Sequence, residues 1–417
     1  MNEAYRPRLV DEKLTQLLGA FGGVLIEGPK WCGKSWTASQ QAATEIYIDQ
    51  QDNRKRALLL PDSVLEGKTP RLIDEWQDAP VLWDTARRII DSRHAPGQFI
   101  FTGSSTVKGE EPSHTGTGRF SRLRMRPLSL YESGDSSGII SLRELFAGGK
   151  LENQISGMDA KTAIRLICKG GWPASFWVCE DATMLIASQY LAFVANADIE
   201  RAGGSTKKPA LVKRILRSLA RNAATSVRLS SVAADVSADG GDVSDQTVRT
   251  YYEALQAIFV VEEQEAWSPS LRSRVRIRAT PKRHLADPSL AAAALGATPP
   301  ALEKDIRTAG FLFETLCFRD LSVYADSLEG TVYHYQDETE LEADAVIQLP
   351  DNRWAALEVK LGTFEFDKAA ENLIKLKGKI AENYPAPAFL GIVTASGGVA
   401  YTRDDGVLIL PIDCLGP

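Results

Sequence analysis

The segment from Gly28 to Ser35 reads GPKWCGKS and matches the pattern GxxxxGK(S/T). It follows the apolar run GGVLIE and precedes a stretch long enough for a helix, which is the context that a phosphate-binding loop requires. Such a loop turns at its glycines so that backbone N–H groups point at a phosphate. The pattern therefore predicts a parallel α/β domain with a nucleotide site where the helix begins.

Residue type suggests a role for several positions of this loop. Lys34 is expected to reach the β- and γ-phosphates of ATP, and Ser35 to ligate Mg²⁺. Gly28 and Gly33 let the backbone wrap, whereas Trp31 and Cys32 occupy variable positions and need no role of their own. The residues expected to line the nucleotide form one run: Gly28, Pro29, Lys30, Trp31, Cys32, Gly33, Lys34, Ser35 and Trp36.

Two later apolar runs end in polar residues that complete such a site. RLIDEW ends in Asp74 and Glu75, where the aspartate would hold the metal and the glutamate would polarise the attacking water. QFIFTGSS ends in Thr102 and Ser104, which would lie beside the γ-phosphate because ligands gather at the carboxyl ends of parallel strands. The alternatives are that Asp74 and Glu75 only start a turn, and that Thr102 and Ser104 only cap the next helix.

Four blocks stand in order over residues 5–132: GPKWCGKS, LIDEWQ, FTGSS and GRFSRLRMRPLSLYE. They resemble the AAA-type ATPases that carry a C-terminal DUF4143 domain, whose blocks run P-loop, DE-Q, TGS and GR-PLS-E. The resemblance implies hydrolysis of ATP and places Arg119 near the nucleotide, either in the same chain or from a neighbouring subunit of a homo-oligomer. A solvated arginine at a strand edge is the alternative for Arg119.

The 417 residues, 44% of them apolar and 24% charged, indicate two or three globular domains. β-like runs alternate with helical stretches over residues 22–125, residues 142–298 are mostly helical in pattern, and a mixed α and β tail follows. We predict an ATPase core over residues 1–135, a helical region with a winged helix-turn-helix over 136–300, and a restriction-endonuclease-like α/β domain over 301–417.

The bulk composition excludes several classes of protein. No charged segment followed by an apolar stretch opens the chain, and no apolar run reaches the roughly 18 residues of a membrane-spanning helix. The five cysteines include no CxxC pair and there are only four histidines, so disulfide frameworks and zinc sites are not expected. We expect a cytoplasmic protein without a membrane partner.

The middle region contains a segment that is basic on one side. Lys213, Arg217 and Arg221 are spaced four apart and would share one helical face, while an apolar face would be buried. RLSSVAADVS and VSDQTVRTYYEALQA then read as two further helices that lead into a β-like run, as in a winged helix-turn-helix. We expect contact with nucleic acid, DNA rather than RNA. A merely solvated helix face is the alternative.

A second basic stretch would form the wing of this module. Period-2 alternation sends four arginines to one side of an expected strand: Arg272, Arg274, Arg276 and Arg278. Winged modules also serve as protein-interaction or ATPase-lid elements, so this alternative stays open.

The tail has the element order of the PD-(D/E)xK nuclease core: helix, three strands, helix, strand. Glu314 lies in the first helix, Asp344 in the second strand, and Glu358 and Lys360 close the third, where both face one side. Glu314, Asp344 and Glu358 would hold a second Mg²⁺ or a Mn²⁺, with Glu358 and Lys360 catalytic. FET, ELEAD and ALEVK also resemble the nuclease-like blocks of the DUF4143 family. A degenerate fold that only binds is the alternative.

These features predict an ATP-binding and ATP-hydrolysing protein that acts on nucleic acid, with a metal-dependent nuclease-like tail as a further candidate activity. The alternative is a regulatory ATPase switch whose tail is a catalytically inactive binding domain. A small-molecule kinase shares the P-loop but seldom needs the adjacent Asp74 and Glu75 or so long an appendage.

Overall fold

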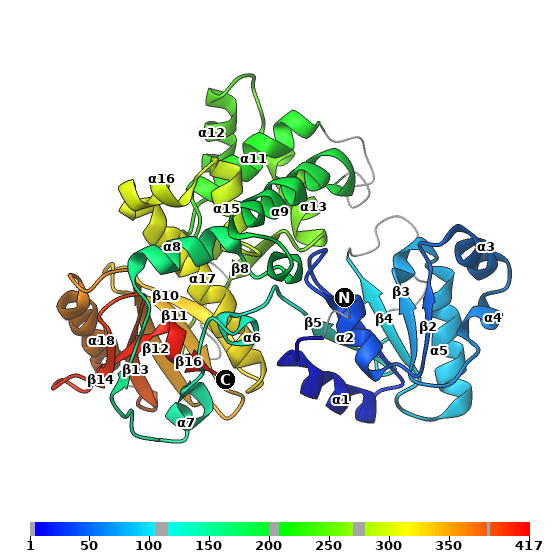
Figure 1. Ribbon diagram of the computed structural model, residues 1–417, viewed down its shortest axis with the longest axis horizontal. Helices are drawn as coiled ribbons and strands as arrows, with labels where there is room; N and C mark the ends of the chain where they lie inside the picture. Colours follow the sequence, from blue (N-terminus) through cyan, green and yellow to red (C-terminus); the bar gives the residue numbers. More distant parts are fainter. Residues whose placement is uncertain (1–4, 105–115, 200–207, 270–279, 382–383) are drawn as a thin grey trace. The chain divides into compact units, whose positions relative to one another are not determined.

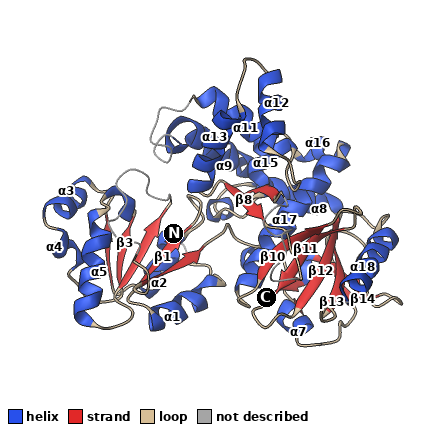
Figure 2. Ribbon diagram, turned by 180° about the vertical axis from the view of Figure 1, so that it is seen from behind, coloured by secondary structure: helices blue, strands red, loops and turns tan. Residues whose placement is uncertain are grey.

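The computed structural model describes residues 5–104, 116–199, 208–269, 280–381 and 384–417 (Figure 1, Figure 2). The chain divides into two compact units. The first contains Met1–Pro127, Asn196–Lys207 and Thr250–Val260, and the second contains Leu128–Ala195, Lys208–Arg249 and Val261–Pro417. Each unit has a sheet of its own, so two separate cores are described.

The first unit is built on a five-stranded parallel sheet. Its strands are β1 Gly23–Glu27, β2 Thr44–Tyr47, β3 Arg71–Asp74, β4 Phe99–Gly103 and β5 Phe120–Arg124, in the order β2-β3-β4-β1-β5. All five strands lie in runs predicted to be β from the sequence. Because β4 lies between β1 and β3, its end stands between the P-loop and the end of β3. The order therefore brings three distant motifs to one edge of the sheet.

Helices cover this sheet. They are α1 Val10–Ala20, α2 Lys34–Gln41, α3 Gln51–Leu59, α4 Pro61–Leu65 and α5 Val81–Arg93, with a 3₁₀ turn η1 at Trp76–Asp78. All five residues of β4 are buried, which explains its continuous apolar run. On one side of the sheet Trp83 stacks on Phe120 at 4.1 Å and meets the edge of Phe101 at 5.6 Å. This aromatic core fixes β4 and β5 against α5.

The second unit begins with helices. They are α6 Leu130–Ser133, α7 Leu142–Phe146, α8 Ala160–Lys169, α9 Glu180–Phe193, α11 Pro209–Arg221, α12 Leu229–Ala238, α15 Pro288–Leu295 and α16 Pro299–Lys304, with a short turn η2 Pro173–Phe176. The helix α13 Asp245–Ala257 and the turn η3 Val194–Asp198 are divided between the two units. β8 Val261–Gln264 and β9 Lys282–Leu285 pair antiparallel. The helices expected after residue 208 are present. The predicted wing arginines, Arg272 to Arg278, lie outside the described residues.

The tail of the second unit has the predicted element order. It contains α17 Ile306–Asp326, β10 Thr331–Gln336, β11 Glu342–Gln348, β12 Trp354–Lys360, α18 Phe366–Ala381, β13 Phe389–Thr394, β14 Val399–Thr402 and β15 Leu408–Pro411. The sheet runs β10-β11-β12-β13-β15-β14-β7, antiparallel from β10 to β12 and parallel from β12 to β15. Trp267 stacks on Trp354 at 4.7 Å in its core.

The tail also recruits residues from the region expected to be helical. β7, Gln154–Ile155, pairs with β14, and β6, Ile140–Ser141, pairs with β16, Leu415–Gly416. Ser136 Oγ donates a hydrogen bond of 2.6 Å to the carbonyl oxygen of Leu415. The end of the chain is therefore held by residues that precede α8.

A buried ion cluster joins the helical part of this unit to α17. The guanidinium group of Arg319 lies 2.8 Å from Asp287 and 2.6 Å from Asp320, and all three side chains are almost fully buried. The other oxygen of Asp320 accepts a bond of 2.8 Å from the backbone N–H of Leu130. Over the described ranges of the chain, no helix combines the length and the apolar character needed to cross a membrane.

Candidate functional site

The P-loop joins β1 to α2, and its conformation depends on glycine at two positions. Gly33 precedes α2 with φ 101°, in the left-handed region. A Cβ atom at Gly28 would lie 2.1 Å from the carbonyl oxygen of Met125. The ammonium group of Lys34 is buried and donates to the carbonyl oxygens of Gly28 at 3.0 Å and Pro29 at 2.8 Å. The loop thus holds its lysine inside the turn that would surround a phosphate.

The metal-binding half of the predicted site converges on one carboxylate. Ser35 Oγ donates to Asp74 Oδ1 at 2.7 Å, and the hydroxyl of Thr102 donates to the same oxygen. Asp74 is buried, so these two hydroxyl groups supply hydrogen bonds that water would otherwise provide. A hydroxyl and a carboxylate in direct contact are oxygen ligands of the kind that Mg²⁺ accepts.

Glu75 follows Asp74 in a left-handed conformation, with φ 54°. Its Oε2 atom accepts hydrogen bonds from the amide of Gln77 and from Ser104 Oγ, the latter at 3.3 Å. Burial raises the pKa of Glu75, against the opposing charge of Lys34. A carboxylate with a raised pKa is better suited to accept a proton from water. Gln77 belongs to the DE-Q block, but its type alone did not reveal that it orients Glu75.

The remaining predicted nucleotide-lining residues differ in their surroundings. Lys30 Nζ lies 2.5 Å from Asp198 of the same unit. Cys32 is fully buried, whereas Trp31 and Trp36 are 47% and 39% exposed. Sequence reasoning missed Arg8, whose guanidinium group donates to the carbonyl oxygens of Cys32 at 2.9 Å and Arg126 at 2.8 Å. Arg8 therefore holds the P-loop in place, although it belongs to no local sequence motif.

Arg119 lies at the amino end of β5. Its carbonyl oxygen accepts a 3.1 Å bond from the N–H of Gly23, which begins β1. Its guanidinium group is 2.8 Å from Asp91 on α5. The P-loop leaves β1 at the opposite end of that strand, after Glu27. This placement does not favour contact between Arg119 and a nucleotide in its own P-loop, whereas the intersubunit role and the structural role at the strand edge both remain as proposals.

The four predicted tail residues lie together around a fifth residue, Lys282 of β9. Lys282 Nζ is 2.5 Å from Glu314 and 3.1 Å from Asp344. Lys360 Nζ is 3.3 Å from Asp344 and 2.6 Å from Glu358. Two lysines thus alternate with three carboxylates, and we call this group the tail cluster. No sequence motif indicated Lys282, because β9 comes close to α17 and β11 only when the chain is folded.

The tail cluster is already supplied with cations. Burial opposes ionisation of Asp344, but the charges of Lys282 and Lys360 hold its pKa well below the usual range. Burial raises the pKa of Glu314 to about 7 and that of Glu358 to about 8, and the nearby Asp344 charge adds to both shifts. Glu358 Oε1 is buried without a hydrogen-bond partner. With three carboxyl groups and only two ammonium groups in the tail cluster, the raised pKa values favour a protonated glutamate near neutral pH.

The contacts of Asp344 leave little room for the predicted metal. Both oxygens of Asp344 are engaged, one by Lys282 and the other by Lys360 and the N–H of Val359. Among the residues that the structure describes, no group of three or more His, Cys, Asp or Glu side chains is arranged to hold a metal ion. As the side chains stand, the tail cluster fits two ammonium groups and does not fit a divalent cation as well.

A neutral histidine lies beside the tail cluster. His284 is fully buried, with Nε2 3.1 Å from Gln264 Oε1 and Nδ1 3.2 Å from Thr315 Oγ1. Its ring stacks on Phe318 with centroids 4.2 Å apart. Burial, together with the charge of Lys282, lowers the pKa of His284 to about 3. The unfolded chain, with a histidine pKa of about 6.5, therefore binds a proton that the folded chain excludes.

We expect this histidine to make the second unit less stable in acid. The contribution of His284 to the free energy of unfolding is fully present above pH 6.5. It is lost as the pH falls toward 3, by up to about 1.4 kcal/mol per pH unit. Urea unfolding between pH 4.5 and 7.5 measures this slope, which His284→Gln should flatten. His94→Gln, at an exposed position, is the matched control. An unchanged slope in His284→Gln would assign the acid sensitivity to other groups.

Three segments of the chain match known domain families. Residues 21–134 match a family described as an AAA domain, and residues 309–415 match DUF4143, a domain of unknown function. Residues 160–301 match a further domain of unknown function, DUF8612, which the sequence did not lead us to expect. The first two matches confirm the AAA domain and the DUF4143 domain that the four blocks implied. The first unit thus contains an ATPase domain of the AAA type.

Two solved structures are similar to the chain. The Walker-type ATPase PABY2304 of Pyrococcus abyssi shares 12% identity, with 68% of this chain and 94% of that chain covered and a TM-score of 0.37. Protein VC1899 from Vibrio cholerae shares 12% identity, with 94% of each chain covered and a TM-score of 0.20. TM-scores this low do not establish a common fold. No curated protein matches the chain.

Proposed function

We propose that the protein is a Mg²⁺-dependent ATPase that acts on nucleic acid. One observation supports the ATPase part of this proposal: Ser35 and Thr102 both donate hydrogen bonds to Asp74, beside the buried Lys34. Ser35 and Asp74 would hold Mg²⁺, which supplies neutralisation of phosphate charge when bound. Phosphate release that requires Mg²⁺ and stops on chelation tests this half. Release that persists in chelator would overturn it.

The chain's own groups suffice for the other steps. The ammonium group of Lys34 and the N–H groups of the P-loop would bind the phosphates. The hydroxyl of Thr102 would orient groups at the γ-phosphate, since it already touches Asp74. Glu75 would receive the proton of the attacking water, while Gln77 and Ser104 fix the direction of its carboxylate. The products are ADP and phosphate.

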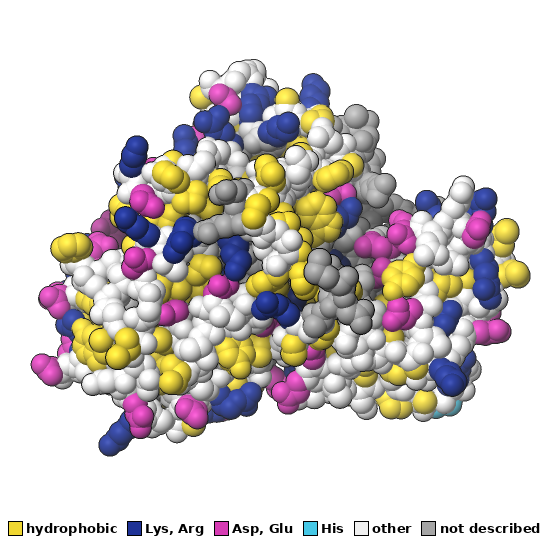
Figure 3. Space-filling view, in the orientation of Figure 1, with side chains coloured by type: hydrophobic (Ala, Val, Ile, Leu, Met, Phe, Trp, Pro, Cys, Tyr) yellow, Lys and Arg dark blue, Asp and Glu magenta, His cyan; other side chains and the backbone are white. Residues whose placement is uncertain are grey.

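The basic face of α11 supports the nucleic-acid half of the proposal. Lys213 and Arg217 are exposed and form no ion pair with any residue in the described parts of the chain, whereas Arg221 pairs with Asp235. The opposite face is buried as expected: Val212, Ile215, Leu216 and Leu219. Figure 3 shows Lys and Arg side chains gathered over the α11 and α12 region. Free cations on a rigid helix suit the phosphates of duplex DNA, as a winged helix-turn-helix would use them.

Binding of the full chain to duplex DNA should therefore weaken steeply with salt. Lys213→Ser/Arg217→Ser is expected to lower the slope of log affinity against log salt by about one to two, because two phosphate contacts are lost. Fluorescence anisotropy with labelled duplex at several salt concentrations measures it. Lys304→Ser on α16 serves as a charge control. Binding that does not respond to salt would contradict the proposal.

Arg119 would act from a neighbouring subunit. If so, mixing Arg119→Ala with Lys34→Ala protein restores part of the ATPase activity that each lacks, since each variant supplies what the other has lost. The expected recovery is up to about one quarter of wild-type turnover for a random dimer with one intact site in the mixed species. Phosphate release from the mixture measures it. Absence of recovery would leave Arg119 with its structural pair, Asp91.

A second candidate function is a regulatory ATPase switch whose tail binds without cutting. The position of Lys282 favours it, because this ammonium group stands where a nuclease would need its metal. Cleavage is the other form of the tail proposal, and it would require a metal on Glu314, Asp344 and Glu358 to displace Lys282, with Lys360 stabilising charge. The unpaired Oε1 atom of Glu358 supports that form. Nicking of plasmid DNA with Mg²⁺ or Mn²⁺, abolished in Asp344→Asn, would decide for cutting.

A further inference from the structure

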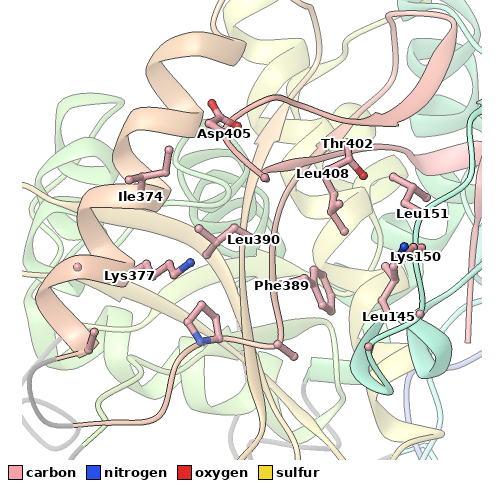
Figure 4. A pocket seen from close by; sticks show the side chains of 17 residues that line it. Leu145, Lys150, Leu151, Ile374, Lys377, Phe389, Leu390, Thr402, Asp405 and Leu408 are labelled. Carbon is pink, nitrogen blue, oxygen red and sulfur yellow. The ribbon is translucent and has the colours of Figure 1, made fainter.

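A pocket of about 790 Å³ opens in the second unit, and it shares no residue with the tail cluster. One wall is α18, with Ile374 and Lys377, and the facing wall is the segment after α7, with Lys150 and Leu151. Figure 4 shows Phe389 and Leu390 between these walls. The volume is typical of sites that bind small organic molecules.

The base of the pocket is apolar and firmly held. Phe389 meets Phe146 edge to face with ring centroids 5.2 Å apart. Arg353 donates a bond of 2.7 Å to the carbonyl oxygen of Phe146, which fixes the end of α7. Leu390 and Leu408 come from neighbouring parallel strands of the sheet, β13 and β15. A flat apolar body could therefore pack on this base without rearranging it.

The charges of the lining are unbalanced. Asp405 is compensated by Arg403 at 3.1 Å and accepts a bond of the same length from the N–H of Val407. Lys150 and Lys377 form no ion pair with the described residues, and their side chains line facing walls. Two other lysines of α18 do have partners, with Lys375 3.7 Å from Glu371 and Lys379 2.6 Å from Asp337. The two cations of the pocket are thus available to an anion.

We propose that this pocket binds a small organic anion with a flat apolar body. The anionic group would lie between Lys150 and Lys377, and the apolar part would cover Phe389, Leu390 and Leu408. An apolar pocket with a few placed polar groups derives its affinity from the buried surface and its selectivity from the charges. The anion is a carboxylate or a phosphate ester, since an ammonium group can donate hydrogen bonds to either.

A matched pair of fluorescent probes tests the proposal on the full chain. 8-Anilinonaphthalene-1-sulfonate carries the anionic group, and N-phenyl-1-naphthylamine is the same molecule without it. We expect the sulfonate to bind at least about 10-fold more tightly than the amine. Lys150→Gln/Lys377→Gln should weaken the sulfonate about 10-fold and leave the amine unchanged. Lys368→Gln/Lys375→Gln removes equal charge from α18 outside the pocket lining and should change neither.

Displacement then identifies the anion. Stronger displacement by 1-naphthyl phosphate than by 1-naphthoate would assign a phosphate ester, and the reverse order a carboxylate; inorganic phosphate should displace neither probe. Equal binding of the two probes, or equal loss in the control double variant, would each overturn the proposal.

Discussion

Replacement of Glu75 by Gln is expected to leave ATP binding intact and to slow hydrolysis by a factor of about 10² to 10³. The amide keeps the shape of the carboxylate but cannot accept the proton of the attacking water. Its neighbours Gln77 and Ser104 remain in place to hold the side chain. Binding is measured with a fluorescent ATP analogue, and turnover by phosphate release in single-turnover conditions.

Two further variants help to interpret the result for Glu75→Gln. Lys34→Ala should abolish ATP binding itself. The substitution removes the ammonium group that would contact the phosphates, and no other side-chain cation is buried in the described P-loop. Glu66→Gln, an exposed carboxylate of the same unit, should change neither binding nor turnover. Wild-type hydrolysis in Glu75→Gln would refute the role given to Glu75 and leave Asp74 as the remaining carboxylate at the site.

The meeting of Ser35, Asp74 and Thr102 was predictable because each belongs to a local motif at the end of a parallel strand. The P-loop fixes one strand end, and apolar runs that stop at Asp74 and Thr102 mark two others. Parallel strands place all carboxyl ends at one edge of the sheet, so all three motifs lie along that edge. The order itself, with β4 between β1 and β3, decides that Thr102 touches Asp74. The residue sequence of each strand does not contain this information.

Arg119 and Lys282 show where sequence reasoning stops. A motif gave Arg119 its expected role, but the register of β5 against β1 places it at the amino edge of the sheet. Lys282 has no motif, and it enters the tail cluster because β9 approaches α17 and β11. The strands β6 and β7 are only two residues long, too short for a periodic pattern. Each of these features depends on contacts between segments far apart in the chain.

The buried position of Lys282 predicts a large loss of stability when its charge is removed. Lys282→Met leaves Glu314 and Asp344 without their shared cation, and breaking a buried ion pair from one side costs about 3 to 5 kcal/mol. Urea unfolding of the second unit at pH 7.5 measures the change. Lys379→Met removes an ammonium group from the half-exposed pair with Asp337 and should cost less than about 1 kcal/mol. Equal losses in the two variants would show that the tail cluster is not the source.

The Lys282→Met variant also distinguishes a tail that only binds from a tail that cleaves nucleic acid. If Lys282 is the resident cation of the tail cluster, Mn²⁺ should leave the wild type unchanged and should restore part of the stability lost in Lys282→Met. The restoration should vanish in Lys282→Met/Asp344→Asn, because Asp344 faces both lysines and would be central to any cation bound there. Mn²⁺ that stabilises the wild type through Asp344 would mean that a divalent ion displaces Lys282, and metal-dependent cleavage would then become the first candidate for the tail.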